Sequence, residues 1–151
     1  MYTIEQVGEE DLLLNYKEIK EQLEKALEYS DGERSAKQII LNSISQPQIY
    51  QIWRVFKDSL PVALGSLRYV QYEGFIALHI TTLSGTTGKN LFDADVYNEW
   101  AGIFEKEVKK NTEIDMLEIT GRRGFVKQLK KAGWTERYTT MRKSLKEILN
   151  G

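Results

Sequence analysis

The sequence predicts an α/β (α+β) fold, in which a mixed central sheet carries helices on both of its faces. The first observation behind this prediction is the order of the elements: a strand, two helices, three strands separated by turns, a helix, a strand, a helix and a strand. The second is the segment 116–134, where a strand pattern, two glycines, a short basic helix pattern and Gly133 follow one another. No repeat or long linker divides the chain, so we expect residues 1–151 to form one domain.

The composition excludes several classes of protein. The net charge of −1 gives no reason to expect a nucleic acid or an acidic membrane surface as a partner. The chain has no cysteine and one histidine, which excludes disulfides, thiolate chemistry and a multi-histidine metal site. No apolar run is long enough to span a membrane, and the N-terminus lacks a signal-peptide core. We therefore expect a cytoplasmic protein without a metal, nucleic-acid or membrane partner.

The first third of the chain predicts one strand and two helices. Tyr2–Val7 alternates apolar and polar residues, as a strand does, and an acidic turn follows it. Leu12–Tyr29 and Ser35–Ile44 have helical periodicity, and Pro47 closes the second of these segments. The apolar stripe expected for the first helix is Leu13, Tyr16, Ile19, Leu23, Ala26 and Leu27.

Three strands in an antiparallel meander are predicted next. Ile49–Lys57, Val62–Tyr72 and Phe75–Thr82 are rich in β-branched and aromatic residues. The dipeptide Glu73-Gly74 marks a hairpin turn between the second and the third of them. Leu83–Asn90 then predicts a glycine-containing loop that leads into a helix.

The last part of the chain predicts a crossover and two more strands. A helix capped by Asp93 or Asp95 is expected to run to Lys110 and to make the strands 75–82 and 117–120 adjacent and parallel. A short basic helix ends at Gly133, which suits a left-handed cap, and Tyr138–Leu145 is expected to be the final strand. The core face of the crossover helix is predicted to be Val96, Trp100, Ile103, Phe104 and Val108.

Two segments give this order a family resemblance. The first is Phe75–Leu83, followed by the glycine loop and a helix; the second is Leu117-Glu118-Ile119, followed by Leu129–Trp134. Together with the element order over nearly the whole chain, they resemble the fourth and fifth strands of the GNAT (GCN5-related N-acetyltransferase) superfamily. The Gly-Arg-Arg-Gly-Phe block at 121–125 is similar to small GNAT-like proteins encoded by bacteriophages.

The resemblance implies a binding site for acetyl-CoA or another acyl-CoA, where the fourth and fifth strands splay apart. The pyrophosphate would lie on backbone amides of the loop and at the start of the next helix, where unpaired N–H groups favour an anion. Of the family's loop pattern only Gly88 matches, so the alternative is an ordinary glycine loop. The positions that the resemblance assigns to the cofactor are Thr82, Leu83, Ser84, Gly85, Gly88, Lys89 and Asn90.

The resemblance also places candidates for the chemistry. His79 on the fourth strand and Glu118 on the fifth are candidate general bases, and the alternatives are a half-buried strand histidine and a surface carboxylate. The backbone amide of Leu83 is the candidate donor to the acetyl carbonyl. Many members have a tyrosine as general acid where this sequence has Leu129, and Tyr138 is a possible replacement.

Two functions follow from the resemblance. The first is an acyl-CoA-dependent N-acyltransferase that moves an acetyl group to a small-molecule or protein amine, with a degraded CoA loop and no tyrosine at the usual position. The second is a non-catalytic GNAT-like phage virion or protein-interaction protein, found in the virion instead of the cytoplasm. The sequence names no amine acceptor, and we expect a monomer or a homodimer.

Overall fold

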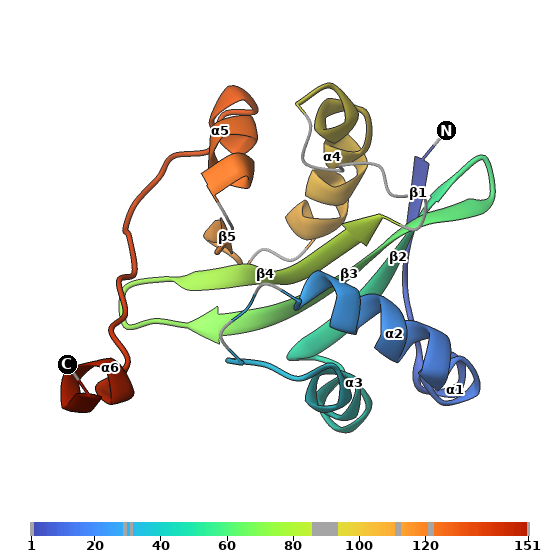
Figure 1. Ribbon diagram of the computed structural model, residues 1–151. Coiled ribbons are helices and arrows are strands. Elements are labelled where there is room, and N and C mark those ends of the chain that lie inside the picture. The colour runs from blue at the N-terminus through green and yellow to red at the C-terminus, as the bar shows by residue number, and fades with distance from the viewer. Residues whose placement is uncertain are drawn as a thin grey trace.

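The computed structural model of the chain describes residues 2–28, 30, 32–85, 94–110, 113–120 and 123–150. A five-stranded sheet with the order β1-β2-β3-β4-β5 forms its centre (Figure 1). The first four strands pair antiparallel, and β5 pairs parallel to β4. This confirms the predicted mixed sheet and the predicted parallel pair. The strands are β1 (Tyr2–Gln6), β2 (Tyr50–Lys57), β3 (Leu60–Gln71), β4 (Ile76–Gly85) and β5 (Met116–Ile119).

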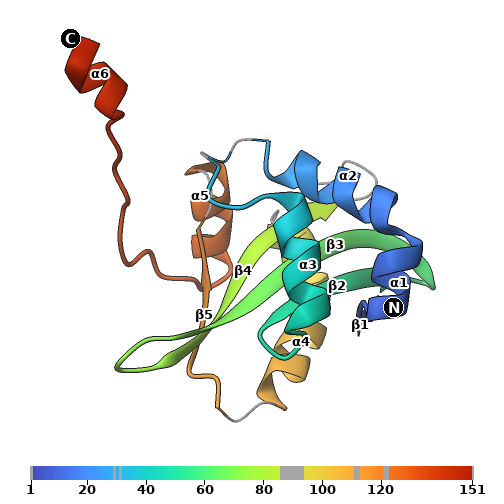
Figure 2. The ribbon, with the colours of Figure 1, turned by 90° about the horizontal axis from the view of Figure 1, so that it is seen from below.

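Helices cover both faces of the sheet. The first three lie on one face and α4 and α5 lie on the other, as Figures 1 and 2 show from two directions. None of the helices in the described ranges is long and apolar enough to cross a membrane. The helices are α1 (Glu9–Leu14), α2 (Tyr16–Ala26), α3 (Ala36–Ser45), α4 (Ala94–Lys109), α5 (Arg123–Lys131) and α6 (Leu145–Asn150).

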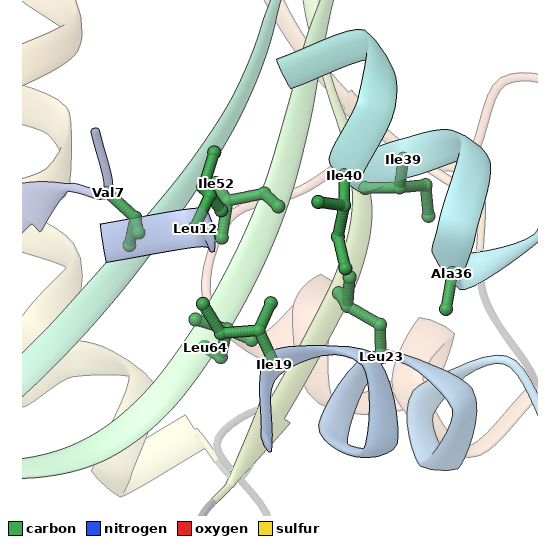
Figure 3. Close-up of a cluster of buried hydrophobic side chains, with 9 residues drawn as sticks. All are labelled: Val7, Leu12, Ile19, Leu23, Ala36, Ile39, Ile40, Ile52 and Leu64. Atoms are coloured by element: carbon green, nitrogen blue, oxygen red, sulfur yellow. The ribbon is translucent and has the colours of Figure 1, made fainter. Parts of the chain in front are cut away.

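One hydrophobic core fills the space between the first three helices and the sheet (Figure 3). Ile19 and Leu23 are four residues apart on α2, so both side chains face the sheet, and neither is more than 2% exposed. Each such side chain stabilises the fold by ~1.5–3 kcal/mol through its burial. The buried residues of this core are Val7, Leu12, Ile19, Leu23, Ala36, Ile39, Ile40, Ile52 and Leu64.

The single helix predicted for Leu12–Tyr29 is wrong, because the helix is interrupted at Asn15. Asn15 has φ −107° and ψ 25°, and its side chain donates a hydrogen bond of 2.7 Å to Asp11 Oδ1. Asparagine favours such local bonds over a helix interior. The break turns Leu12 into the core, where it is fully buried, and leaves Leu13 61% exposed, so the predicted stripe is wrong at its first member.

A second core lies between the other face of the sheet and α4 and α5. Phe104 of α4 and Leu129 of α5 are 8% and 5% exposed, and Val108 packs beside them, as the helical spacing predicts. The side chains of Val96 and Trp100 lie outside the described residues. The remaining buried members of this core are Leu67, Leu78 and Ile80.

Helix α5 ends as the sequence predicts. Gly133 has a positive φ of 94°, a conformation that glycine adopts without steric strain because it has no Cβ. Trp134 N–H donates to the Leu129 carbonyl at 3.0 Å, and Gly133 N–H donates to the Lys130 carbonyl at 3.2 Å. These bonds satisfy carbonyls that the helix end leaves open. Trp134 then packs against the second core.

Both hairpins form, and one is tighter than predicted. Tyr72 N–H donates to the Phe75 carbonyl at 2.9 Å across the predicted Glu73-Gly74 turn. The connection between β2 and β3 consists only of Asp58 and Ser59, whose φ values of 50° and 68° match the twist of a two-residue hairpin. Strand β3 therefore begins at Leu60, before Pro61, and not at Val62.

Strand β4 is longer than predicted. It continues through Leu83 to Gly85, although the loop was expected to begin at Leu83. Strand β3 provides the reason, since it offers Ala63 as a pairing partner for Gly85 and Gly65 as one for Leu83. The other predicted loop positions, Gly88, Lys89 and Asn90, lie outside the described residues.

The final strand predicted at Tyr138–Leu145 is wrong. The segment between α5 and α6 contains no strand and runs away from the sheet (Figure 2). Tyr138 and Met141 are 93% and 87% exposed. The apolar residues of this segment are three and four positions apart, so a strand made from it would have no single apolar face to lay against the sheet. Its described ties to the body include an ion pair between Arg142 and Glu33.

Candidate active site

The candidate site lies where β4 and β5 stop pairing. The two strands pair over four positions, and the last pair joins Ile80 to Ile119. Strand β4 continues through Thr81–Gly85, beyond the end of β5, so this part of its edge has no β5 partner. A register shift adds to the irregularity, because Ser66 pairs with Thr82 and Leu67 with Ile80. Thr81 is therefore an extra residue in β4, as in a β-bulge, which bends a strand locally.

A row of four polar residues crosses the sheet just before this point. Tyr50 of β2 is the register partner of Arg68, which is the partner of His79, which is the partner of Glu118. Arg68 follows the buried core residue Leu64 by four positions on β3, so alternation places it on the same face, towards α1–α3. The row therefore occupies the face that carries the first three helices.

His79 and Glu118 form a hydrogen-bonded pair within this row. His79 Nδ1 lies 2.9 Å from Glu118 Oε1, and the two side chains are 14% and 28% exposed. Tyr72, at the end of the β3–β4 hairpin, donates its hydroxyl proton to the same Glu118 oxygen at 2.8 Å. Two donors on one carboxylate oxygen fix its position, and the imidazole is oriented through it.

The surroundings favour the neutral form of His79. Burial lowers the pKa of His79 below its ordinary value of 6.5, and the positive charges of Arg68 and Arg34 lower it further, against the opposing effect of Glu118. A neutral imidazole whose Nδ1–H donates a hydrogen bond to Glu118 keeps a lone pair on Nε2. Its hydrogen bond to Glu118 raises the pKa of Tyr72, so Tyr72 keeps its proton. The arrangement can accept a proton at Nε2.

Of the predicted cofactor residues, the structure describes Thr82, Leu83, Ser84 and Gly85. Thr82 is 5% exposed, and its hydroxyl lies 2.5 Å from the Ser66 hydroxyl, inside the sheet. Ser84 donates to the Leu64 carbonyl, and its own carbonyl accepts from Gln22 of α2 at 3.4 Å. The structure therefore places Thr82–Gly85 along the free edge of β4, with the Thr82 and Ser84 side chains already bonded.

Neither residue considered as general acid joins the row. Leu129 is 5% exposed within the second core, on the face of the sheet away from His79. Tyr138 is 93% exposed and lines an open hollow of about 530 Å³ at the base of the C-terminal segment, together with Trp134.

Four polar residues near His79 are not among those predicted from the sequence: Tyr72, Arg68, Tyr50 and Arg34. Alternation along β3 already places Arg68 and Tyr72 on one face, which was an available signal. Their proximity to His79 depends on the register between β3 and β4, which the sequence does not show. In the described ranges no three His, Cys, Asp or Glu residues are arranged to hold a metal ion.

No family model and no curated protein matches the sequence. Solved structures match the fold instead. A protein from Clostridium acetobutylicum described as a predicted acetyltransferase, solved with acetyl-CoA, has a TM-score of 0.62 at 13% identity, over 97% of this chain and 98% of the other. A GNAT family acetyltransferase from Staphylococcus aureus has a TM-score of 0.61 at 10% identity, over 95% and 98%.

An aminoglycoside acetyltransferase from an uncultured soil metagenomic sample, solved with sisomicin, has a TM-score of 0.58 at 10% identity, over 95% of both chains. The chain therefore has the fold of the GNAT acetyltransferases, as the resemblance of its strands predicted. The similarity to phage-encoded proteins stays a prediction.

Proposed function

We propose that the chain is an acetyl-CoA-dependent N-acetyltransferase that transfers the acetyl group directly to an amine. The observation that carries the proposal is the His79–Glu118 pair, which lies beside the point where β4 and β5 stop pairing. Similar folds belong to acetyltransferases, one of them solved with acetyl-CoA and another with an aminoglycoside, which is an amine. Fold alone does not fix an activity, so the pair is the stronger argument.

The free edge of β4 fits the acetyl end of the cofactor. Backbone N–H and C=O groups of Thr81–Gly85 face no β5 strand, and the Leu83 amide is our candidate donor to the acetyl carbonyl. Gly88, Lys89 and Asn90 are proposed to hold the phosphates. When bound, acetyl-CoA supplies an acetyl group activated as a thioester.

The residues of the row then have distinct roles. His79 Nε2 takes the proton from the amine as its nitrogen forms a bond to the acetyl carbon. Glu118 holds the Nδ1 proton and stabilises the imidazolium that results. Tyr72 holds Glu118 in place. A positioned general base of this kind contributes ~100- to 10,000-fold to the rate.

Two observations favour a non-catalytic binding protein as the second candidate. The family's tyrosine position is taken by Leu129, which is buried and has no acid–base chemistry. The C-terminal segment also exposes Tyr138, Met141, Leu145 and Leu149, each by at least 73%, which suits a contact with another protein.

Acetyl-CoA binding separates the two candidates. At ~100 times its dissociation constant, acetyl-CoA should stabilise the fold by ~2.7 kcal/mol. In a chain of this length that raises the melting temperature by several degrees in a thermal unfolding assay. No shift at millimolar acetyl-CoA, together with no heat in calorimetry, would favour the binding protein.

Kinetics of two variants then test the roles. His79→Gln should lower turnover by ~100-fold or more while the affinity for acetyl-CoA stays unchanged, because His79 acts on the amine proton. Glu118→Gln should lower turnover less, since it leaves the base in place. Glu73→Gln, in the exposed hairpin turn, is the control and should behave as wild type. If His79→Gln is fully active and Glu118→Gln is inactive, the base is Glu118.

A further inference from the structure

Two arginines, Arg68 and Arg34, act electrostatically on His79, and among the described residues neither has an acidic partner. Arg68 stands between Tyr50 and His79 in the row, and cross-strand neighbours of this kind have Cβ atoms about 5 Å apart. The Nε atom of Arg68 is buried and has no hydrogen-bond partner among the residues that the structure describes. Buried polar atoms without a partner are few in folded proteins, and each calls for an explanation such as an absent ligand.

Arg34 adds a second positive charge from another element. It is half-buried in the connection between α2 and α3, and its charge acts on His79. In the described part of the chain neither Arg34 nor Arg68 makes an ion pair, whereas Arg54 pairs with Asp11 and Arg142 with Glu33. Glu118 makes no ion pair with either arginine in the described ranges; its Oε1 atom accepts hydrogen bonds from Tyr72 and His79.

We propose that Arg68 and Arg34 form an anion subsite beside His79, and that the amine acceptor carries an acidic group, a carboxylate or a phosphate, that binds there. The planar guanidinium presents paired N–H donors that match either group. As a statement about the acceptor, this inference rests on the proposed function; as a statement about an anion site, it does not.

The inference narrows the class of acceptor. An amine on the same small molecule as the acidic group can reach His79 while the acidic group contacts Arg68. A polyamine would place further positive charge against two arginines and is disfavoured. The reaction is the proposed transfer: the amine nitrogen bonds to the acetyl carbon, the carbon–sulfur bond breaks, and the amine proton goes to His79.

The single histidine of the chain gives a direct test of the subsite. Its ring signals in an NMR spectrum belong to His79 alone, so no assignment is needed. The full-length protein is titrated with acetate and, separately, with inorganic phosphate at constant ionic strength. We expect a saturable shift of the ring signals and a higher pKa of His79, because a nearby anion stabilises the imidazolium.

Variants show which residues hold the anion. Arg68→Gln should weaken the affinity for the anion, measured by the shift of the His79 ring signals, at least ~tenfold, and Arg34→Gln should weaken it less. Arg68→Lys should retain part of the affinity, because lysine keeps the positive charge but lacks the paired N–H donors of the guanidinium. Lys37→Gln removes an exposed positive charge on α3 and should leave this affinity unchanged. Thermal unfolding of each variant verifies that it is folded.

Two results would overturn the anion subsite: no saturable shift with either anion, or the same shift in Arg68→Gln as in wild type. Loss of the shift in the presence of saturating CoA would overturn its assignment to the acceptor, since the anion bound there would then be a phosphate of the cofactor.

An acceptor panel tests the substrate class. Release of CoA is measured with glycine and β-alanine, with an amino sugar phosphate, with neutral amines and with spermidine. We expect the amines that carry an acidic group to be the best acceptors, and Arg68→Gln to raise their KM about tenfold with a smaller change for neutral amines. Preference for spermidine or for neutral amines would overturn the acceptor class. Failure to bind acetyl-CoA would remove the proposed function, while the NMR titration would still decide the anion site.

Discussion

His79 and Glu118 are ordinary polar residues of two strands until their register is known. From the sequence alone, His79 has the alternative of a half-buried strand histidine, and Glu118 has that of a surface carboxylate. The structure joins them at 2.9 Å and adds Tyr72 on the same carboxylate oxygen. Burial and two nearby arginines then keep the imidazole neutral near pH 7. The chemistry of the site therefore belongs to the group and not to any one residue.

At the scale of single residues, we predict that the free energy of unfolding decreases as the pH falls below about 6.5. The pKa of His79 is lowered in the folded state, so in that pH range the unfolded chain binds more protons than the folded one. Its contribution to stability is thus complete above its ordinary pKa of 6.5 and is lost as the pH falls through that value towards the folded pKa. Urea unfolding between about pH 5.5 and about pH 7.5 measures this dependence.

His79→Gln is the control for this prediction. The variant cannot titrate there, so its stability should change less over the same range. Asp11 has a lowered pKa through its bond to Arg54, but its contribution is lost only as the pH falls below about 3.8, outside this range. An equally steep dependence in His79→Gln would show that other groups cause it.

At the scale of helices and strands, some element ends depend on nearby residues and others depend on pairing with a distant strand. Helix α5 ends at Lys131 and is capped by Gly133, where both the sequence and the structure put a left-handed residue. Strand β4, by contrast, extends past its predicted end because β3 is long enough to pair with it. A cap is decided by neighbours in the sequence, whereas the end of a strand is decided by another strand.

We predict that Gly133→Ala destabilises the fold by ~1–2 kcal/mol, because an L-residue is strained at this positive φ. A Cβ at this position would meet no atom within 4 Å, so strain alone is measured. Gly133→Asn should cost less, since asparagine tolerates this conformation.

Gly102→Ala is the matched control, because Gly102 lies inside α4 and a Cβ there would also meet nothing within 4 Å. It should stabilise the fold by up to ~1 kcal/mol through the helix propensity of alanine. Urea unfolding measures all three variants. If Gly133→Ala leaves the free energy of unfolding unchanged, an L-residue is not strained at the cap.

At the scale of the molecule the sheet separates the chemistry from the second core. The polar row shares a face with the first three helices, and Leu129 packs on the opposite face with Phe104. A tyrosine at position 129 would therefore point into a core and not towards His79. The tyrosine that acts as general acid in many GNAT members would not reach His79 from position 129.

We predict that Leu129→Tyr destabilises the fold by ~1–3 kcal/mol, because it overfills a well-packed core, and that it does not raise turnover. Leu129→Met conserves volume and should cost less than ~1.5 kcal/mol. Urea unfolding and release of CoA measure the two effects. A Leu129→Tyr variant as stable as wild type and faster in turnover would show that position 129 reaches the site.

The sequence determined much of this protein by itself. It defined the order of the elements, the hairpin turn at Glu73-Gly74, the cap at Gly133 and the parallel pair of strands. The first three of these features depend on residues near one another in the chain, through periodicity and turn chemistry, and the parallel pair follows from the handedness of a crossover connection. The resemblance of two segments to the GNAT superfamily also supplied His79 and Glu118 as candidates.

Only the tertiary structure decided how these parts meet. The pairing of His79 with Glu118, and the place of Arg68 beside them, follow from strand register, since a shift of one residue would turn them to the opposite face. The segment 138–144 was decided in the same way, because it found no partner strand. Such contacts join residues distant in the chain, and local patterns do not specify them.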